Sequence, residues 1–120
     1  MVEAAKRWES AGILVNALNP GRITDTGLTR HIGGVGKAPG TFESSSTDVS
    51  WKDSKQGAAT SVLLAASPLI DGVSGRYFED ANEAGPHQEG VRRGVANYAL
   101  DAMSAERLWK LSESLIENAK

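Results

Sequence analysis

The tripeptide Asn19-Pro20-Gly21 is the feature whose residue types and position best suit ligand binding. It follows a near-continuous apolar run at residues 13–18, and proline with glycine ends a strand and opens a loop. If that strand is parallel, the tripeptide lies at its carboxyl end, where open α/β sheets bind ligands, and glycine permits close approach of a ligand. An ordinary strand-ending turn has the same composition, so the tripeptide alone does not decide between the two interpretations.

Two other patterns are weaker candidates for a binding site. The glycines Gly34, Gly36 and Gly40 are spaced somewhat like a dinucleotide loop, but such a loop must follow a strand and open a helix, so we interpret the stretch as a flexible loop. The two histidines, His31 and His87, belong to no spaced ligand set, and the chain has no cysteine. No metal site is therefore predicted.

Three carboxylates also cluster late in the chain, at Glu79, Asp80 and Glu83. Paired carboxylates can act as a general acid and base, but acidic side chains are mostly exposed in proteins. We therefore interpret this cluster as a solvated acidic loop. No serine lies in a Gly-x-Ser-x-Gly elbow, and surface positions are expected for both histidines.

The first elements that must position the tripeptide are a helix and a strand. Val2, Ala5 and Trp8 recur at helical spacing, and Gly12 suits the position just past a helix end. No capping residue precedes the helix, so we expect the chain to begin inside a longer one. The run at residues 13–18 has little alternation, which is typical of a parallel strand buried on both faces.

The later elements are two helices and a short strand. Asp53 is expected to cap a helix ending near Ala66, and Ser104 to cap a last helix. Residues 75–78 are a brief strand candidate, and residues 79–94 are expected to be irregular. The apolar face of the first of these helices is predicted to contain Ala58, Val62 and Ala65.

Composition limits the function classes. The 120 residues fit one small domain, and 40% hydrophobic with 23% charged residues is ordinary for a globular protein. A formal charge of −2 gives no electrostatic reason to expect nucleic-acid binding. The longest uncharged stretch is too short for a membrane span, and no signal peptide is present, so a cytoplasmic location is expected.

The number of strands predicts an incomplete sheet. A buried parallel strand needs hydrogen-bonding partners on both edges, and the chain offers only one further short strand. We therefore expect the fold to be α/β, the carboxyl-terminal portion of a Rossmann-type doubly wound parallel sheet that lacks the amino-terminal strands.

The whole chain resembles the carboxyl-terminal part of the short-chain dehydrogenase/reductase family, in its retinol-dehydrogenase-like branch. The resemblance rests on ordered segments across nearly the full length: residues 3–8 (EAAKRW), 12–21 (GILVNALNPG), 56–60 (QGAAT), 65–68 (AASP), 75–80 (GRYFED) and 105–109 (AERLW). It implies that residues 1–120 are part of an NAD(P)-binding domain and that residues 22–50 correspond to the substrate loop.

The resemblance also implies site residues. Pro20 and Gly21 would line the nicotinamide end of NAD or NADP, and the backbone of Ile23 would meet the carboxamide. A threonine two residues further on commonly approaches the pyrophosphate; this sequence has Asp25 there, so Thr26 is expected to take over the contact. Like charges about 4 Å apart cost roughly 1–4 kcal/mol, so Asp25 is expected to disfavour a pyrophosphate.

The family's catalytic Tyr-x-x-x-Lys is absent from this sequence. Tyr77 is followed four residues later by Ala81, and Tyr98 by Ala102, so no catalytic residue is assigned. We expect a segment of an NAD(P)-dependent oxidoreductase acting on an alcohol or carbonyl substrate, inactive alone and with doubtful affinity for the cofactor by itself. The alternative is a non-catalytic module that associates with itself or with another chain through its open sheet edge and the apolar faces of its helices.

Overall fold

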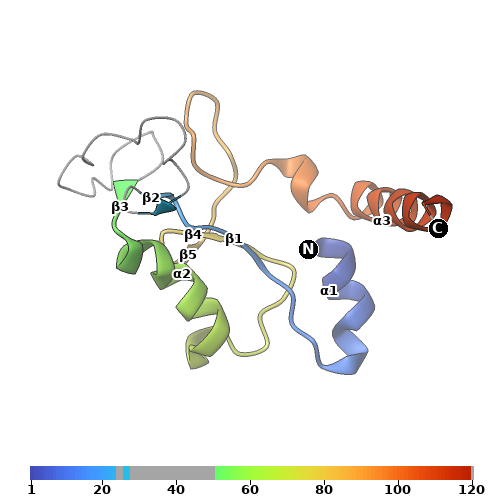
Figure 1. Cartoon of the computed structure of the whole chain (residues 1–120), viewed down its shortest axis with the longest axis horizontal. Coiled ribbons are helices and arrows are strands. Elements are labelled where there is room, and N and C mark those ends of the chain that lie inside the picture. The colour runs from blue at the N-terminus through green and yellow to red at the C-terminus, as the bar shows by residue number, and fades with distance from the viewer. Residues whose placement is uncertain (24–25, 28–50, 120) are drawn as a thin grey trace.

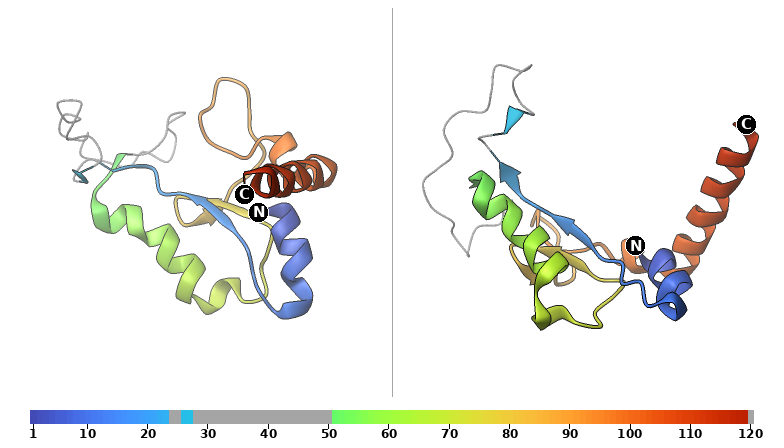
Figure 2. Two further views of the ribbon diagram at one scale, coloured as in Figure 1. Left: turned by 45° about the vertical axis from the view of Figure 1, so that its right-hand side comes forward. Right: turned by 60° about the horizontal axis from the view of Figure 1, so that its bottom comes forward.

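The structure, a computed structural model, describes residues 1–23, 26–27 and 51–119. It is an α/β arrangement in which helices α1 (Val2–Trp8) and α2 (Ser54–Ala66) flank a small sheet, and α3 (Ala102–Asn118) extends away beside α1 (Figure 1). Figure 2 shows the same relation from two further directions. The expected α/β class is confirmed.

The main sheet has the order β1-β4-β5, with β1 (Ala17–Asn19) parallel to β4 (Tyr77–Glu79) and β4 antiparallel to β5 (Asn82–Glu83). The strand expected at residues 75–78 is confirmed, shifted toward the carboxyl end. No described strand pairs with the other edge of β1.

The expectation of a strand buried on both faces at residues 13–18 is wrong. Regular pairing covers only the three residues of β1, and Ile13 and Leu14 are each 49% exposed. The side chain of Asn16 instead links the segment before β1 to the segment before β4. Its Nδ2 donates to the Val73 carbonyl (2.8 Å), and its Oδ1 accepts from the Arg76 N–H (3.0 Å). An apolar run indicates affinity for a strand but not whether other elements cover it.

A second, two-stranded parallel pair consists of β2 (Arg22–Ile23) and β3 (Trp51–Lys52). Arg22 is in register with Trp51, and Ile23 with Lys52. The guanidinium of Arg22 also lies 5.2 Å from the centre of the Trp51 ring, in cation–π range. Of the loop expected at residues 22–50, Arg22 and Ile23 instead form strand β2. Residues 24–25 and 28–50, with His31 among them, lie outside the described residues.

Helix α1 ends as predicted. A 3₁₀ turn, η1 (Glu9–Ala11), continues it, and Gly12 follows with φ +72°, a left-handed conformation that favours glycine. Helix α1 contacts α3 through the rings of Trp8 and Trp109, whose centres are 5.8 Å apart in an edge-to-face arrangement.

Helix α2 begins as predicted but presents a different face to the sheet. Asp53 and Gln56 form a reciprocal capping box, in which the Asp53 carboxylate accepts from the Gln56 N–H (2.8 Å). The predicted face is wrong, because Ala58, Val62 and Ala65 are exposed, whereas Gly57 and Thr60 are buried. Small and polar side chains occupy the inner face because β2 and the β4–β5 turn approach α2 closely there.

The stretch expected to be irregular after residue 79 contains a hairpin. Strands β4 and β5 meet in a turn whose residues Asp80 (φ +50°) and Ala81 (φ +58°) are both left-handed. Two such residues in succession define a type I′ turn, which matches the twist of a hairpin but is unusual without glycine or asparagine at the second position. The irregular stretch that follows ends in 3₁₀ turn η4 (Asn97–Leu100).

Helix α3 is capped by Asp101, and the prediction of Ser104 as the cap is wrong. The Asp101 carboxylate accepts from the Ser104 backbone N–H (2.6 Å), so Ser104 lies inside the first turn. Four large apolar side chains of α3 remain between 54% and 65% exposed: Leu108, Leu111, Leu115 and Ile116. The described helices include none long and apolar enough to cross a membrane.

The apolar core of the described residues is small. Among the described residues, Ala5, Phe78 and Val95 are the buried hydrophobic ones, with Phe78 only 3% exposed at the centre of β4. Since apolar burial is the main driving force of folding, this part of the chain depends strongly on hydrogen bonds and ion pairs between its elements.

Candidate functional site

The candidate site lies at the carboxyl edge of the parallel pair. Strands β1 and β4 run in the same direction, so their last residues, Asn19 and Glu79, end at one edge of the sheet. The turn Asn19-Pro20-Gly21 leaves β1 at this edge and leads directly into β2. The sequence-based placement of this turn at the carboxyl end of a parallel strand is therefore confirmed.

The turn has a defined local geometry. The Gly21 N–H donates to the Asn19 side-chain oxygen (2.9 Å), and Gly21 has φ +85°, which a residue with a side chain adopts only with strain. No side chain projects from Gly21, so an approaching ligand can reach the backbone at this point.

Tyr77 neighbours the turn from β4. Partial burial raises the pKa of its phenol and the charge of Glu79 raises it further, while a hydrogen bond with the Asn19 side chain opposes both effects. The phenol therefore stays protonated at neutral pH. It holds the end of β1 as a neutral hydrogen-bonding group.

Ile23 is fixed in place from two sides. Its backbone lies in β2 beside Lys52 of β3, and its side chain packs against α2 at Gly57. The four predicted cofactor residues are therefore only partly brought together: Pro20, Gly21 and Ile23 are consecutive parts of one ordered turn and strand, whereas Thr26 is an exposed residue of a bend. Asp25 lies outside the described residues.

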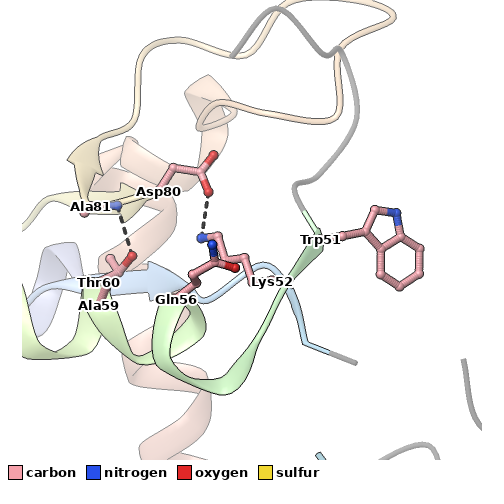
Figure 3. A pocket seen from close by; sticks show the side chains of 7 residues that line it. All are labelled: Trp51, Lys52, Gln56, Ala59, Thr60, Asp80 and Ala81. Atoms are coloured by element: carbon pink, nitrogen blue, oxygen red, sulfur yellow. Dashed lines mark hydrogen bonds and ion pairs between the residues drawn. The ribbon is translucent and has the colours of Figure 1, made fainter. Parts of the chain in front are cut away.

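Beside β3 lies a cavity of about 290 Å³ (Figure 3). Its lining residues come from β3, α2 and the β4–β5 turn: Trp51, Lys52, Gln56, Ala59, Thr60, Asp80 and Ala81. None of the four predicted cofactor residues is among them. In Figure 3 the Trp51 ring points away from the polar groups of the cavity, and Lys52 and Asp80 face each other.

Glu79 and Asp80 are half-buried and have partners, so the expectation of a solvated acidic loop is wrong for these two carboxylates, whereas Glu83 is exposed as expected. Asp80 pairs with Lys52 Nζ (2.7 Å) and lies 3.6 Å from a guanidinium nitrogen of Arg93. Glu79 accepts from the Gly94 N–H (2.8 Å), and Glu83 pairs with Arg76 (3.3 Å). Sequence reasoning missed the partners of Asp80 and Glu79 because Lys52, Arg93 and Gly94 come from other segments of the chain.

Three further residues of this region escaped sequence reasoning. Thr60 is 0% exposed, and its hydroxyl accepts the N–H of Ala81 (3.0 Å). Lys52 is almost as buried, and Gly57 supports Ile23. Glycine inside a helix was the one available signal, since an interior helical glycine commonly marks close packing.

The histidine that the structure describes has a structural contact. His87 Nδ1 lies 3.1 Å from the carbonyl of Arg93, within the loop before η4. Among the described residues, no three histidine, aspartate or glutamate side chains come together as metal ligands would.

Parallel strands with helices beside them, and a glycine turn at their carboxyl edge, are the arrangement of part of a Rossmann-type α/β fold. Relatives among curated proteins agree with this class. A probable oxidoreductase of Streptomyces antibioticus is 47% identical over 96% of this chain and 40% of its own length. Retinol dehydrogenase 14 of Homo sapiens is 38% identical over 95% of this chain and 31% of its own length.

A third relative, the chloroplastic short-chain dehydrogenase TIC 32 B of Brassica napus, is 36% identical over 92% of this chain and 30% of its own length. The chain belongs to the short-chain dehydrogenase/reductase family. It spans about 30–40% of the length of these relatives. No family model and no solved structure matches it.

Proposed function

We propose that the chain forms the nicotinamide side of an NAD(P) site in a short-chain oxidoreductase that acts on an alcohol or carbonyl carbon. The observation that carries the proposal is the turn at Pro20 and Gly21, which leaves a parallel strand at its carboxyl edge. Family membership supports the choice of a nicotinamide cofactor over other ligands.

The residues present fit such a ligand. Gly21 offers backbone without a side chain, and Ile23 offers the backbone of a strand that is fixed to α2. A bound nicotinamide would supply hydride transfer. The chain's own residues would bind and orient the ring: Pro20 and Gly21 along its side, the Ile23 backbone at the carboxamide, and Thr26 toward the pyrophosphate.

The acid–base step is not assigned to this chain. Tyr77 and Tyr98 lack a lysine four residues further on, and Tyr77 is a hydrogen-bonding partner of Asn19. The 120 residues by themselves are therefore expected to bind the cofactor weakly and to turn over no substrate.

A titration of the isotope-labelled chain, followed by backbone amide NMR, tests the proposal. Nicotinamide mononucleotide should shift the amide signals of Gly21 and Ile23, while AMP, which lacks the nicotinamide, should leave them unchanged. NADH and NADPH are titrated in parallel, because the sequence does not choose between them. An absence of any shift at these amides with all three nicotinamide compounds would refute the proposal.

A variant at the turn sharpens the same test. Gly21→Ala places a side chain at φ +85°, so the strained turn should change and binding of the mononucleotide should weaken. The matched control is Gly12→Ala, which carries a similar left-handed strain at the end of η1, distant from the turn in sequence. Equal affinity in the Gly21 and Gly12 variants would contradict the role given to the turn.

Self-association is a second proposed property, favoured by the exposed apolar side chains of α3. Leu108, Leu111 and Leu115 follow one another at intervals of three and four residues and are more than half exposed. Sedimentation of the chain should show a discrete oligomer that the charge of Leu111→Lys dissociates. A monomer at all concentrations would contradict this second proposal and leave the first unaffected.

A further inference from the structure

Gly57 of α2 and Ile23 of β2 are in unusually close contact. A β-carbon built at Gly57 would lie 2.3 Å from Ile23 Cδ1 and 2.7 Å from Ile23 Cγ1, distances at which something must move. The next atom, the Pro20 carbonyl oxygen, would be 3.8 Å away, an ordinary contact. Residues 20 and 23 therefore both approach α2 at the one position that has no side chain.

Helix formation alone disfavours glycine at this position. Gly57 is buried within α2 and its N–H bonds to the Asp53 carbonyl (2.9 Å) in the first helical turn. Alanine is the better helix former, and the capping box at Asp53 works equally well with it. What glycine contributes here is space, and Ile23 occupies that space.

A second contact holds the same segment from the side. Ile23 is in register with Lys52, whose side chain is 8% exposed and whose ammonium pairs with Asp80 (2.7 Å) at the end of β4. Strand β2 is thus fixed against α2 by packing and, through β3, against the main sheet by an ion pair. A shift of Ile23 away from α2 would move the backbone that follows Gly21.

We propose that Gly57 is a positioning residue: the space it leaves seats Ile23 against α2 and thereby sets the backbone at residues 20–23 that receives the nicotinamide. This inference rests on the proposed function and adds to it a residue that touches no ligand. Gly57 acts on the backbone at residues 20–23 through its contact with the Ile23 side chain.

The test compares Gly57→Ala with two partners. In the first, Gly57→Ala combined with Ile23→Ala, the two clashing atoms are removed and the new methyl group has room. In the second, Gly85→Ala, the same substitution is made where an added β-carbon meets nothing within 4 Å. Binding of nicotinamide mononucleotide is followed at the Gly21 amide signal, and folding by circular dichroism and denaturant unfolding.

Gly57→Ala should weaken mononucleotide binding about five- to tenfold, as the loss of one well-placed backbone hydrogen bond does. It should also shift the amide signals of residues 21–23 without ligand. Ile23→Ala alone should weaken binding as well, and the double variant should bind no more weakly than Ile23→Ala alone, because the added methyl group then meets no Ile23 side chain. Gly85→Ala should bind like the wild type. If Gly57→Ala does not fold, Ile23→Ala alone carries the test, because it removes the seated side chain and keeps the backbone; its binding should weaken as well.

Wild-type affinity in Gly57→Ala, or in Ile23→Ala where that variant carries the test, overturns the inference while the proposed function stands. Losses of affinity that simply add in the double variant also overturn it, because the effect of Gly57→Ala then does not pass through the Ile23 side chain. A wild-type chain that shows no response to the mononucleotide refutes the proposed function, and the inference falls with it.

Discussion

Thr60→Val replaces a buried hydroxyl by a methyl group of the same shape. Thr60 is 0% exposed on the inner face of α2, and its Oγ1 accepts the N–H of Ala81 (3.0 Å) in the left-handed turn between β4 and β5. Valine fills the same volume and is similarly branched at the β-carbon, so packing and helix propensity are nearly unchanged. The substitution therefore isolates one hydrogen bond.

The expected loss of unfolding free energy is about 1–2 kcal/mol, the lower part of the range for leaving a polar group without its partner. The lower part applies because Ala81 itself is exposed, so water can reach its N–H once the turn loosens. The left-handed conformation of Ala81, which its side chain disfavours, will also be released more easily when that bond is lost.

Denaturant unfolding measures the loss, and hydrogen exchange of the Ala81 amide locates it. Thr60→Ser, which keeps the hydroxyl, is the matched control and should retain the protection of that amide. If Thr60→Val unfolds at the wild-type denaturant concentration and Ala81 exchanges at the wild-type rate, then the side chain does not hold the turn, and the assignment is wrong.

Three further predictions concern the helices. Asp53→Ala should destabilise the chain by about 0.5–2 kcal/mol through loss of the α2 cap, whereas Asp53→Asn should be nearly neutral, as denaturant unfolding would show. The bond to the Ser104 N–H lowers the pKa of Asp101, so the stability from this cap is complete above the ordinary pKa of aspartate and is lost as the pH falls through the lower folded value. Helicity by circular dichroism should show this acid transition, and Asp101→Asn should lack it. Trp109→Ala should abolish the near-ultraviolet dichroism of the edge-to-face pair with Trp8 and lower stability by about 1–2 kcal/mol; an unchanged spectrum would contradict the contact.

Local signals in the sequence predicted the helices well. Asp53 and Gly12 determine a start and an end through bonds or backbone angles within a few residues, so their roles follow from residue type. The family and the class of fold followed from ordered motifs. The turn at Pro20 and Gly21 was located correctly because proline and glycine stop a strand whatever surrounds it.

Properties that depend on distant partners could not be predicted in the same way. The inner face of α2 is defined by the approach of Ile23 and Ala81, so its buried residues are Gly57 and Thr60 rather than the apolar ones. Asp80 was predicted to be solvated because its partner, Lys52, comes from another segment of the chain. Burial of residues 13–18 was overestimated because an apolar run does not reveal what covers it.

The parallel pairing of β2 with β3 separates the framework from the residues that run between Ile23 and Trp51. The two strands that flank this stretch, here called its stems, are both held in place. Strand β2 packs against α2 at Gly57, and β3 is held by the Lys52–Asp80 ion pair. The positions of both stems are therefore set by contacts with the scaffold rather than by the chain that joins them.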